Sequence, residues 1–259
     1  MPGGTRRFRL FVSSTFRDFV AEREALRRNV YPRLRRRCEA QGGTFEAVDL
    51  RWGVSREAAE HQRTMAICLE EVDRCARTTE RPNFLLLLGD RLGWRPLPAE
   101  IQADLLADLG RLLGGDPAHA RAAELLNEWY GHTRDDNAVP PVHHLGPAER
   151  AAADEVTLRR ALESVLGDVT PEVHATLVGG ATEQEVRRRL ALGPIDGGRA
   201  VIAIRQIRDL PDSPEATAFA DLDAGGRPDG SARSRHRKLQ TELESVAGEI
   251  GRASCRERV

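Results

Sequence analysis

Three short segments of the chain carry side chains that could bind an anionic ligand such as a nucleotide. The first, Ser13-Ser14-Thr15, supplies hydroxyl groups and free backbone N–H groups at the start of a helix, and both suit a phosphate. The other two segments each combine a carboxylate, a guanidinium and an indole ring that could stack on a base. Their members are Asp49, Arg51, Trp52 and Gly53 in one segment, and Gly89, Asp90, Arg91 and Trp94 in the other.

Each segment also has a purely structural explanation. Ser14 or Thr15 could serve only as a helix cap, because hydroxyl side chains accept hydrogen bonds from the first N–H groups of helices. Trp52 and Trp94 could close the end of a sheet by packing. One segment alone is weak support for a site, so the hypothesis depends on whether the fold brings the three segments together.

The pattern around these segments predicts a parallel sheet. Strands are expected near residues 8–13, 44–50 and 83–88, and the last is apolar throughout, as in a central strand covered on both faces. An amphipathic helix is expected after the first strand and another from Met65 to Cys75. Alternating strands and helices indicate βαβ units. If the first strand lies between the second and third, all three polar segments meet at the carboxyl-end edge, where ligands of such sheets bind.

The first helix contains an unusual arginine. The segment Thr15-Phe-Arg-Asp18 has the spacing of a capping box, and Gly42-Gly43 is expected to end the helix. Arg23 falls within the apolar face, so it should be paired, with Asp49 or Asp18 as the partner. A structural ion pair is favoured over a ligand contact for this residue. The apolar face itself consists of Phe16, Phe19, Val20, Leu26, Val30, Leu34 and Cys38.

The second half of the chain predicts a helical insertion before a last strand at residues 200–204. One α/β domain is therefore expected over residues 1–208, with a helical insertion at about 96–192. Residues 209–231 read as a linker or mobile loop, and 232–249 as a helix leading to a further module. Within the insertion, helices are expected at 96–113, 118–130, 147–165 and 182–192, the last opened by the capping box Thr182-Glu-Gln-Glu185, and a polar loop at 131–146.

Composition excludes several classes of protein. The 259 residues include 39 basic and 40 acidic ones, which gives a net charge of −1 and argues against a nucleic-acid-coating protein. No apolar run approaches the roughly 18 residues of a membrane span, so a cytoplasmic protein without a membrane partner is expected. Lys238 is the only lysine, and this strong preference for arginine indicates a GC-rich, bacterial genome.

Cysteine and histidine residues do not indicate a metal site. The four cysteines form no CxxC pair, and His143-His144 has no third ligand in view, so no metal is expected. The last ten residues, Ile250 to Val259, match the in-frame translation of a common sequencing adapter. We therefore expect this tail to be non-native and the natural chain to continue differently beyond residue 249.

Several motifs in order carry a family resemblance. They are RLFVSSTFRDFVAERE, VDLRWGVS, CLEEVDRC and LLLLGDRLGWRP. Together they resemble an uncharacterised N-terminal domain of bacterial STAND-type NTPases, and N-terminal segments of animal NACHT and WD-repeat proteins and of telomerase-associated protein 1. The resemblance is strong over residues 7 to about 101 and looser to about 210. It implies a TIR-like, flavodoxin-like fold of three layers, placed ahead of a nucleotide-driven oligomerisation module. Leu92 departs from the family, which usually has an aromatic residue there.

The resemblance implies an effector or signalling domain that acts by self-association or adaptor contacts, in defence or signalling. No GxxxxGK[ST] motif occurs, so the NTPase module itself is expected outside this chain. The alternatives are a TIR-like enzyme that cleaves NAD and a domain that senses NAD or another nucleotide. For the enzyme, Glu100 would be the catalytic carboxylate, although it also fits an ordinary helix start.

Overall fold

The computed structural model describes residues 6–50, 64–146, 150–167, 169–195, 197–207, 214–222, 226–246 and 251–255. The chain divides into two compact units. Unit 1 takes its described residues from Met1–Ser55, Thr64–Trp94 and Gly180–Val259, and unit 2 takes them from Arg95–Gly179. Among the described residues, no helix is long and apolar enough to cross a membrane.

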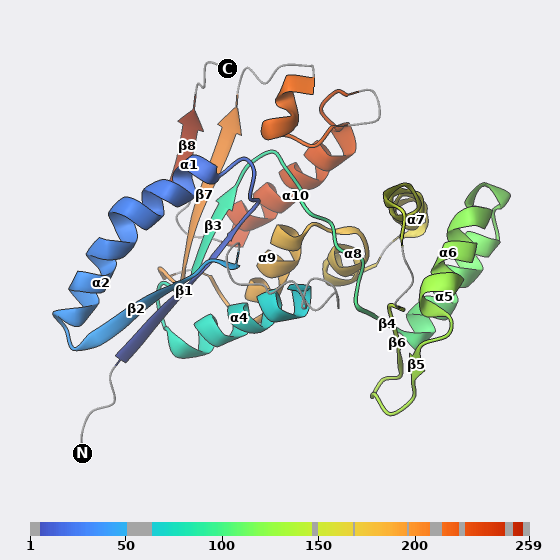
Figure 1. The fold of residues 1–259 in the computed structure, drawn as a ribbon, viewed down its shortest axis with the longest axis horizontal. Coiled ribbons are helices and arrows are strands. Elements are labelled where there is room, and N and C mark those ends of the chain that lie inside the picture. The colour runs from blue at the N-terminus through green and yellow to red at the C-terminus, as the bar shows by residue number, and fades with distance from the viewer. Residues whose placement is uncertain are drawn as a thin grey trace. The chain divides into compact units, whose positions relative to one another are not determined.

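Unit 1 is built on a parallel sheet of order β2-β1-β3-β7-β8 (Figure 1). Its strands are β1 (Arg6–Ser14), β2 (Gly43–Val48), β3 (Phe84–Leu88), β7 (Ala200–Ile207) and β8 (Gly251–Cys255). All five residues of β3 are buried, and β3 pairs with β1 on one side and β7 on the other. The predicted central position of this strand and the predicted place of β1 between β2 and β3 are both confirmed.

Helices cover both faces of this sheet, because side chains along β3 alternate between two separate cores. Phe84, Leu86 and Leu88 belong to the first core. It also includes residues of three helices: α4 (Thr64–Thr78), α9 (Ala181–Ala191) and α10 (Gly230–Val246). Leu85 and Leu87 face the second core, which Phe19 and Tyr31 complete. The predicted flavodoxin-like α/β fold of three layers is therefore confirmed.

The first helix differs from its prediction in two ways. It begins at Val20, as α1 (Val20–Ala25), because the Thr15 hydroxyl donates to the Asp18 carboxylate instead of capping the helix N–H groups. It then passes through a π-helical turn, η1 (Leu26–Val30), into α2 (Tyr31–Glu39). The wide turn adds a residue and moves Tyr31, instead of Val30, into the core. Phe16, Val20 and Val30, which were predicted to be buried, are exposed.

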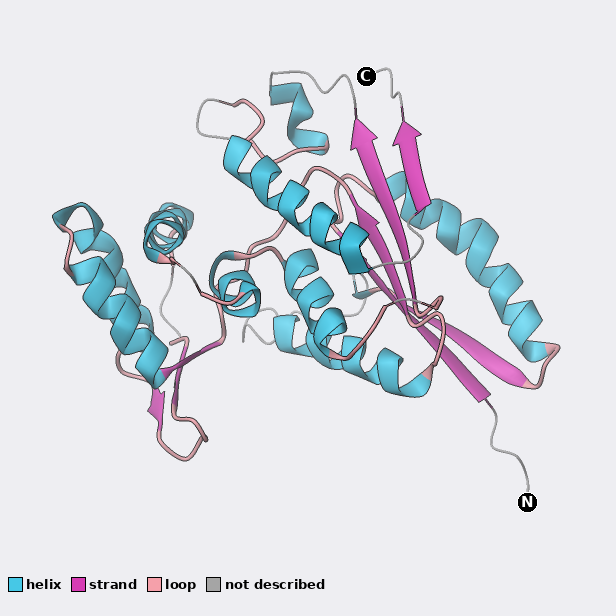
Figure 2. Cartoon of the chain, turned by 180° about the vertical axis from the view of Figure 1, so that it is seen from behind, coloured by secondary structure: helices cyan, strands magenta, loops and turns pink. Residues whose placement is uncertain are grey.

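Unit 2 has its own apolar core and a small antiparallel sheet of order β4-β6-β5. Its helices include α5 and α6, which lie side by side (Figure 2). The elements are β4 (Glu100–Gln102), α5 (Ala103–Gly114), η3 (Pro117–His119), α6 (Ala120–Tyr130), β5 (Arg134–Asp135), β6 (Val142–His144), α7 (Ala152–Val165) and α8 (Pro171–Val178).

Unit 2 corrects several predicted boundaries. The helix expected from residue 96 begins at Ala103, because residues 100–102 pair with β6 as a strand. The loop expected at 131–146 contains β5 and β6, which are too short to show an alternating pattern. The helix expected from residue 147 begins at Ala152, and α8 was not predicted.

The predicted capping box at Thr182 is also wrong. The helix α9 starts one residue earlier, at Ala181, with Gly180 as its N-cap and no side-chain cap. Both Thr182 and Glu185 are buried instead of exposed at a helix end. This helix packs against α4 within unit 1. Part of the segment read as a linker is ordered against the same unit: η4 (Pro214–Ala218) leads into a bridge between Ala220 and Asp90.

Candidate functional site

The carboxyl ends of β1, β2 and β3 place most of the predicted site residues of unit 1 along one edge of the sheet. Ser13 and Ser14 end β1, Asp49 follows β2 directly, and Gly89 follows β3 directly. Because the three strands are neighbours and parallel, their ends lie together. We call the polar side chains gathered there the rim network. Its described members are Ser13, Ser14, Thr15, Asp18, Arg23, Asp49, Glu185 and Arg205.

Arg23 is held entirely inside this network. Its side chain is 1% exposed and forms an ion pair with the Asp49 carboxylate. Its Nε donates to the Ser14 hydroxyl at 2.7 Å, and one terminal nitrogen donates to the Ser14 carbonyl at 3.1 Å. Of the two predicted partners, Asp49 is the correct one. A buried guanidinium with all these partners holds two strand ends and a helix together and has few donors left for a ligand.

Ser13 pairs with a carboxylate that sequence reasoning missed. The Ser13 hydroxyl donates to Glu185 of α9 at 2.5 Å, and neither residue is exposed by more than 8%. Burial raises the pKa of Glu185 to about 7, against the opposing effects of the Ser13 hydrogen bond and the positive charge of Arg23. The sequence of α9 did contain an indication of this buried carboxylate. At helical spacing, Thr182, Glu185 and Arg189 share one face with the apolar Val186, and that face is buried.

Asp18 forms the third part of the network. It accepts from the Thr15 hydroxyl and pairs with Arg205 of β7 at 3.1 Å. Arg205 also contacts Glu22 at 2.7 Å and lies 4.1 Å from the ring centre of Phe19. Burial raises the pKa of Asp18, while the Thr15 hydrogen bond and Arg205 act in the opposite direction. Arg205 was not predicted, because nothing in a strand sequence shows a partner 187 residues away.

The loop after β3 packs tightly against the same residues. A Cβ atom at Gly89 would lie 2.8 Å from a carboxylate oxygen of Asp18. Gly93 has a φ of +69°, and a Cβ atom there would lie 2.6 Å from the Thr15 methyl group. Asp90 bridges to Ala220, as noted above, and Arg91 lies 3.9 Å from the Asp221 carboxylate. These glycines let the loop approach the rim network, and the charged residues hold the 214–222 segment.

Two predicted site residues fall outside the described part of the chain, and two others take no part in the rim network. Arg51 and Trp52 lie outside the described residues. Trp94, which was predicted to stack on a ligand or to close the end of the sheet, is 53% exposed. Glu100 belongs to unit 2, where it lies in β4 with its side chain 58% exposed and 3.4 Å from His144. Glu100 and the serines therefore belong to different units of the chain.

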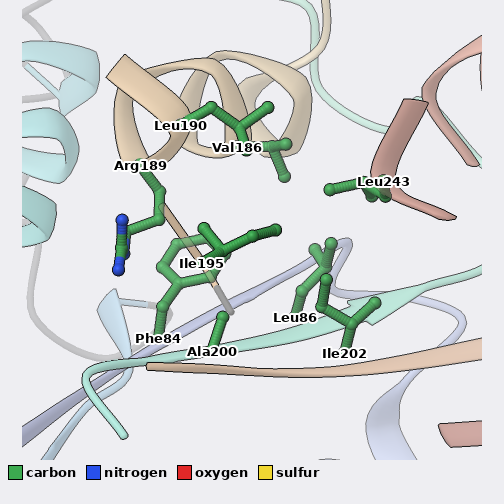
Figure 3. A pocket seen from close by; sticks show the side chains of 9 residues that line it. All are labelled: Phe84, Leu86, Val186, Arg189, Leu190, Ile195, Ala200, Ile202 and Leu243. Atoms are coloured by element: carbon green, nitrogen blue, oxygen red, sulfur yellow. The ribbon is translucent and has the colours of Figure 1, made fainter. Parts of the chain in front are cut away.

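A small void lies in the core of unit 1. It has a volume of about 10 Å³ and lies between the sheet and helices α9 and α10 (Figure 3). Phe84, Ala200 and Arg189 line it, and these residues mark the amino ends of β3 and β7, away from the rim network. The void has room for one water molecule at most. Among the described residues, no group of three or more histidine, cysteine, aspartate or glutamate side chains is arranged to hold a metal ion.

Comparisons with known proteins agree with the fold and the motifs. Residues 9–103 match a family model described as Domain of unknown function (DUF4062). The chain is 32% identical over 198 residues to NACHT domain- and WD repeat-containing protein 1 of Mus musculus, covering 73% of this chain and 12% of that protein. It is 35% identical over 148 residues to NACHT and WD repeat domain-containing protein 2 of Homo sapiens, covering 57% of this chain and 8% of that protein.

A further relative matches the first part of the chain. Telomerase protein component 1 of Rattus norvegicus is 40% identical over 93 residues, which covers 36% of this chain and 3% of that protein. No solved structure matches the chain significantly. The chain thus spans about an eighth or less of these curated relatives. Residues 9–103 are thus similar to the DUF4062 family, within a chain that resembles part of the NACHT and WD-repeat proteins.

Proposed function

We propose that this chain is an effector or signalling module of a STAND-type NTPase, which acts by self-association or by contact with an adaptor protein. One observation carries the proposal: the rim network uses its polar groups internally, while two large apolar side chains beside it face outward. Phe16 is 51% exposed and Val20 is 55% exposed. The similarity to NACHT-containing proteins supports a place in a larger multidomain protein.

Phe16 and Val20 have the properties of a protein-contact surface. The central carbon of the buried Arg23 guanidinium lies 5.2 Å from the centre of the Phe16 ring. The rim network beneath Phe16 therefore holds this ring in position. Val20 begins α1 four residues later. An aromatic anchor fixed in place before binding loses little conformational entropy when a partner covers it, and such residues contribute most of the affinity of protein interfaces.

The alternative activity, NAD cleavage by a TIR-like enzyme, has less support. Its predicted carboxylate, Glu100, is solvent-exposed in unit 2, and the predicted phosphate-binding hydroxyls of Ser13 and Thr15 donate to Glu185 and Asp18. A ligand would have to displace buried hydrogen bonds that the fold already makes. Nucleotide sensing at the same edge meets the same obstacle. We further propose that the signalling belongs to a bacterial defence system in the cytoplasm, as the family resemblance implies.

Self-association of the clustered chain tests this proposal. The chain is fused to an oligomerising scaffold, and association between clusters is measured by light scattering over a concentration series. We expect Phe16→Asp and Val20→Asp each to weaken association at least tenfold, because a charge would be buried in the contact. Leu192→Asp is the matched control, since Leu192 is 40% exposed but follows α9 at the amino end of the sheet. Equal association in wild type and Phe16→Asp would contradict the proposal.

A further inference from the structure

Unit 2 contains a groove of about 310 Å³ between α5 and α6, the two helices that lie side by side in Figure 1. Three small residues at helical spacing, Ala103, Ala107 and Gly110, form the α5 side, and Ala123 lies on the α6 side. No side chain at these positions is long enough to fill the space between the helices. The volume lies at the lower end of the range for small-molecule sites, which begins at about 300 Å³.

Part of the groove is lined by apolar side chains, and the rest by the polar side chains of Asn127, Arg134 and His143. Leu106 and Leu126 are buried and contribute apolar surface. His143 of β6 lines the polar region with Arg134 of β5. Arg134 is engaged with Asp136, its Nε donating to the carboxylate at 2.7 Å. Asn127 and Arg134 are both exposed, so His143 is the buried polar side chain among the described residues that line the groove.

The orientation of His143 defines what it can recognise. The residue is 9% exposed, and its Nδ1 lies 2.7 Å from the Tyr130 carbonyl oxygen. A carbonyl can only accept, so Nδ1 carries the proton, and in the neutral ring Nε2 is left as a hydrogen-bond acceptor. Within the described part of the chain, Nε2 has no hydrogen-bond partner and is not sealed from solvent. A buried ring that lines a cavity with a vacant acceptor selects a ligand with a donor.

We propose that this groove binds a small planar apolar molecule with a single N–H or O–H donor, of the indole or phenol class. The two leucines and the alanine stripe cover the flat faces, and the donor bonds to Nε2 of His143. A partner helix is the wrong size, because one turn of a helix about 10 Å across and 5.4 Å long already occupies more than the groove. The site is independent of the contacts proposed for unit 1.

Indole and 1-methylindole, used as probes on the whole chain, test the proposal by calorimetry. The two differ in the N–H donor, so we expect indole to bind with a dissociation constant of about 1 mM or below. We expect 1-methylindole to bind about tenfold more weakly, the effect of one hydrogen bond. Absence of indole binding, or equal affinity for the two probes, would overturn the assignment.

Two variants locate the binding. Ala107 is exposed, so Ala107→Phe should fold normally, fill the groove and weaken indole binding at least tenfold. Leu112→Phe is the control, because Leu112 lies on the same helix, is 51% exposed and does not line the groove. His143→Phe keeps the ring shape without the acceptor and should bind both probes equally. Unchanged indole affinity in Ala107→Phe would place the binding elsewhere and contradict the proposal.

Discussion

The rim network of unit 1 and the groove of unit 2 use their polar groups in opposite ways. In the rim network, Ser13, Arg23 and Asp18 all have partners within the protein, and these partners lie in α9, directly after β2 and in β7, respectively. In the groove, small side chains leave space, and one buried imidazole keeps a vacant acceptor. The difference teaches that residue types suited to phosphate binding can serve the fold, whereas a binding site needs unfilled volume as well as chemistry.

The largest effect is expected when the rim network loses its central cation. Arg23→Met leaves Asp49 and Ser14 without their shared partner, so we expect the free energy of unfolding to fall by about 3 kcal/mol or more. Urea denaturation measures it. Arg27→Met, which removes an exposed pair with Glu24, is the control and should leave the free energy of unfolding nearly unchanged. A loss at Arg23 no larger than at Arg27 would mean that the network does not hold the fold.

A pH dependence is expected from Glu185. Its pKa is raised to about 7 in the folded protein from an ordinary 4.5, so the folded state binds the proton more tightly than the unfolded state between those pH values. Stability should therefore decrease as pH rises from about 4.5 to 7 and then level off, by on the order of 3 kcal/mol.

The variant Glu185→Gln isolates this contribution. It keeps a hydrogen-bonding side chain of the same shape but cannot ionise, so it should equal the wild type near pH 5 and exceed its stability at pH 8. Thermal denaturation across this pH range provides the measurement. If the stability of wild type and of Glu185→Gln changed with pH in the same way, Glu185 would not be the source of the pH dependence.

Two glycine substitutions compare the two regions directly. Gly93→Ala places a methyl group 2.6 Å from Thr15 in a left-handed conformation, so it should cost about 1–3 kcal/mol. Gly110→Ala places one in the open groove within helix α5, where no atom lies within 4 Å, so it should stabilise by about 0.5–1 kcal/mol. Opposite signs in chemical denaturation support the contrast between a filled edge and an empty groove. Stability changes of the same sign in the two variants would contradict this contrast.

The smallest effect is expected at the tail. Residues 251–255 pair with β7 as the edge strand β8. Their match to adapter sequence predicts that deleting Ile250 to Val259 leaves the melting temperature unchanged within error, since nothing selected these residues to pack. A decrease of several degrees would show that β8 belongs to the fold and that the rim network sits in a five-stranded sheet.

Much of unit 1 could be predicted, because its signals are local. The apolar run within residues 83–88 indicated a central strand, and Arg23 on the apolar helix face indicated a buried pair with Asp49 or Asp18. The partners Glu185 and Arg205 could not be found this way, because they reach the rim from 172 and 187 residues away and follow from packing alone. The groove could not be predicted for a related reason. Alanine and glycine residues at helical spacing are common in ordinary helices, and only the packing of α5 against α6 shows that they leave a space.

The most direct test of the central claim, that the rim network is structural and not catalytic, is an assay of NAD cleavage. The chain, clustered on an oligomerising scaffold so that assembly cannot limit activity, is incubated with NAD, and free nicotinamide is measured against the scaffold alone. The account predicts no nicotinamide above that background. Nicotinamide release above that background would contradict it, and a fall in that release on the order of 100-fold in Glu100→Gln would identify Glu100 as a charge-stabilising carboxylate of the reaction.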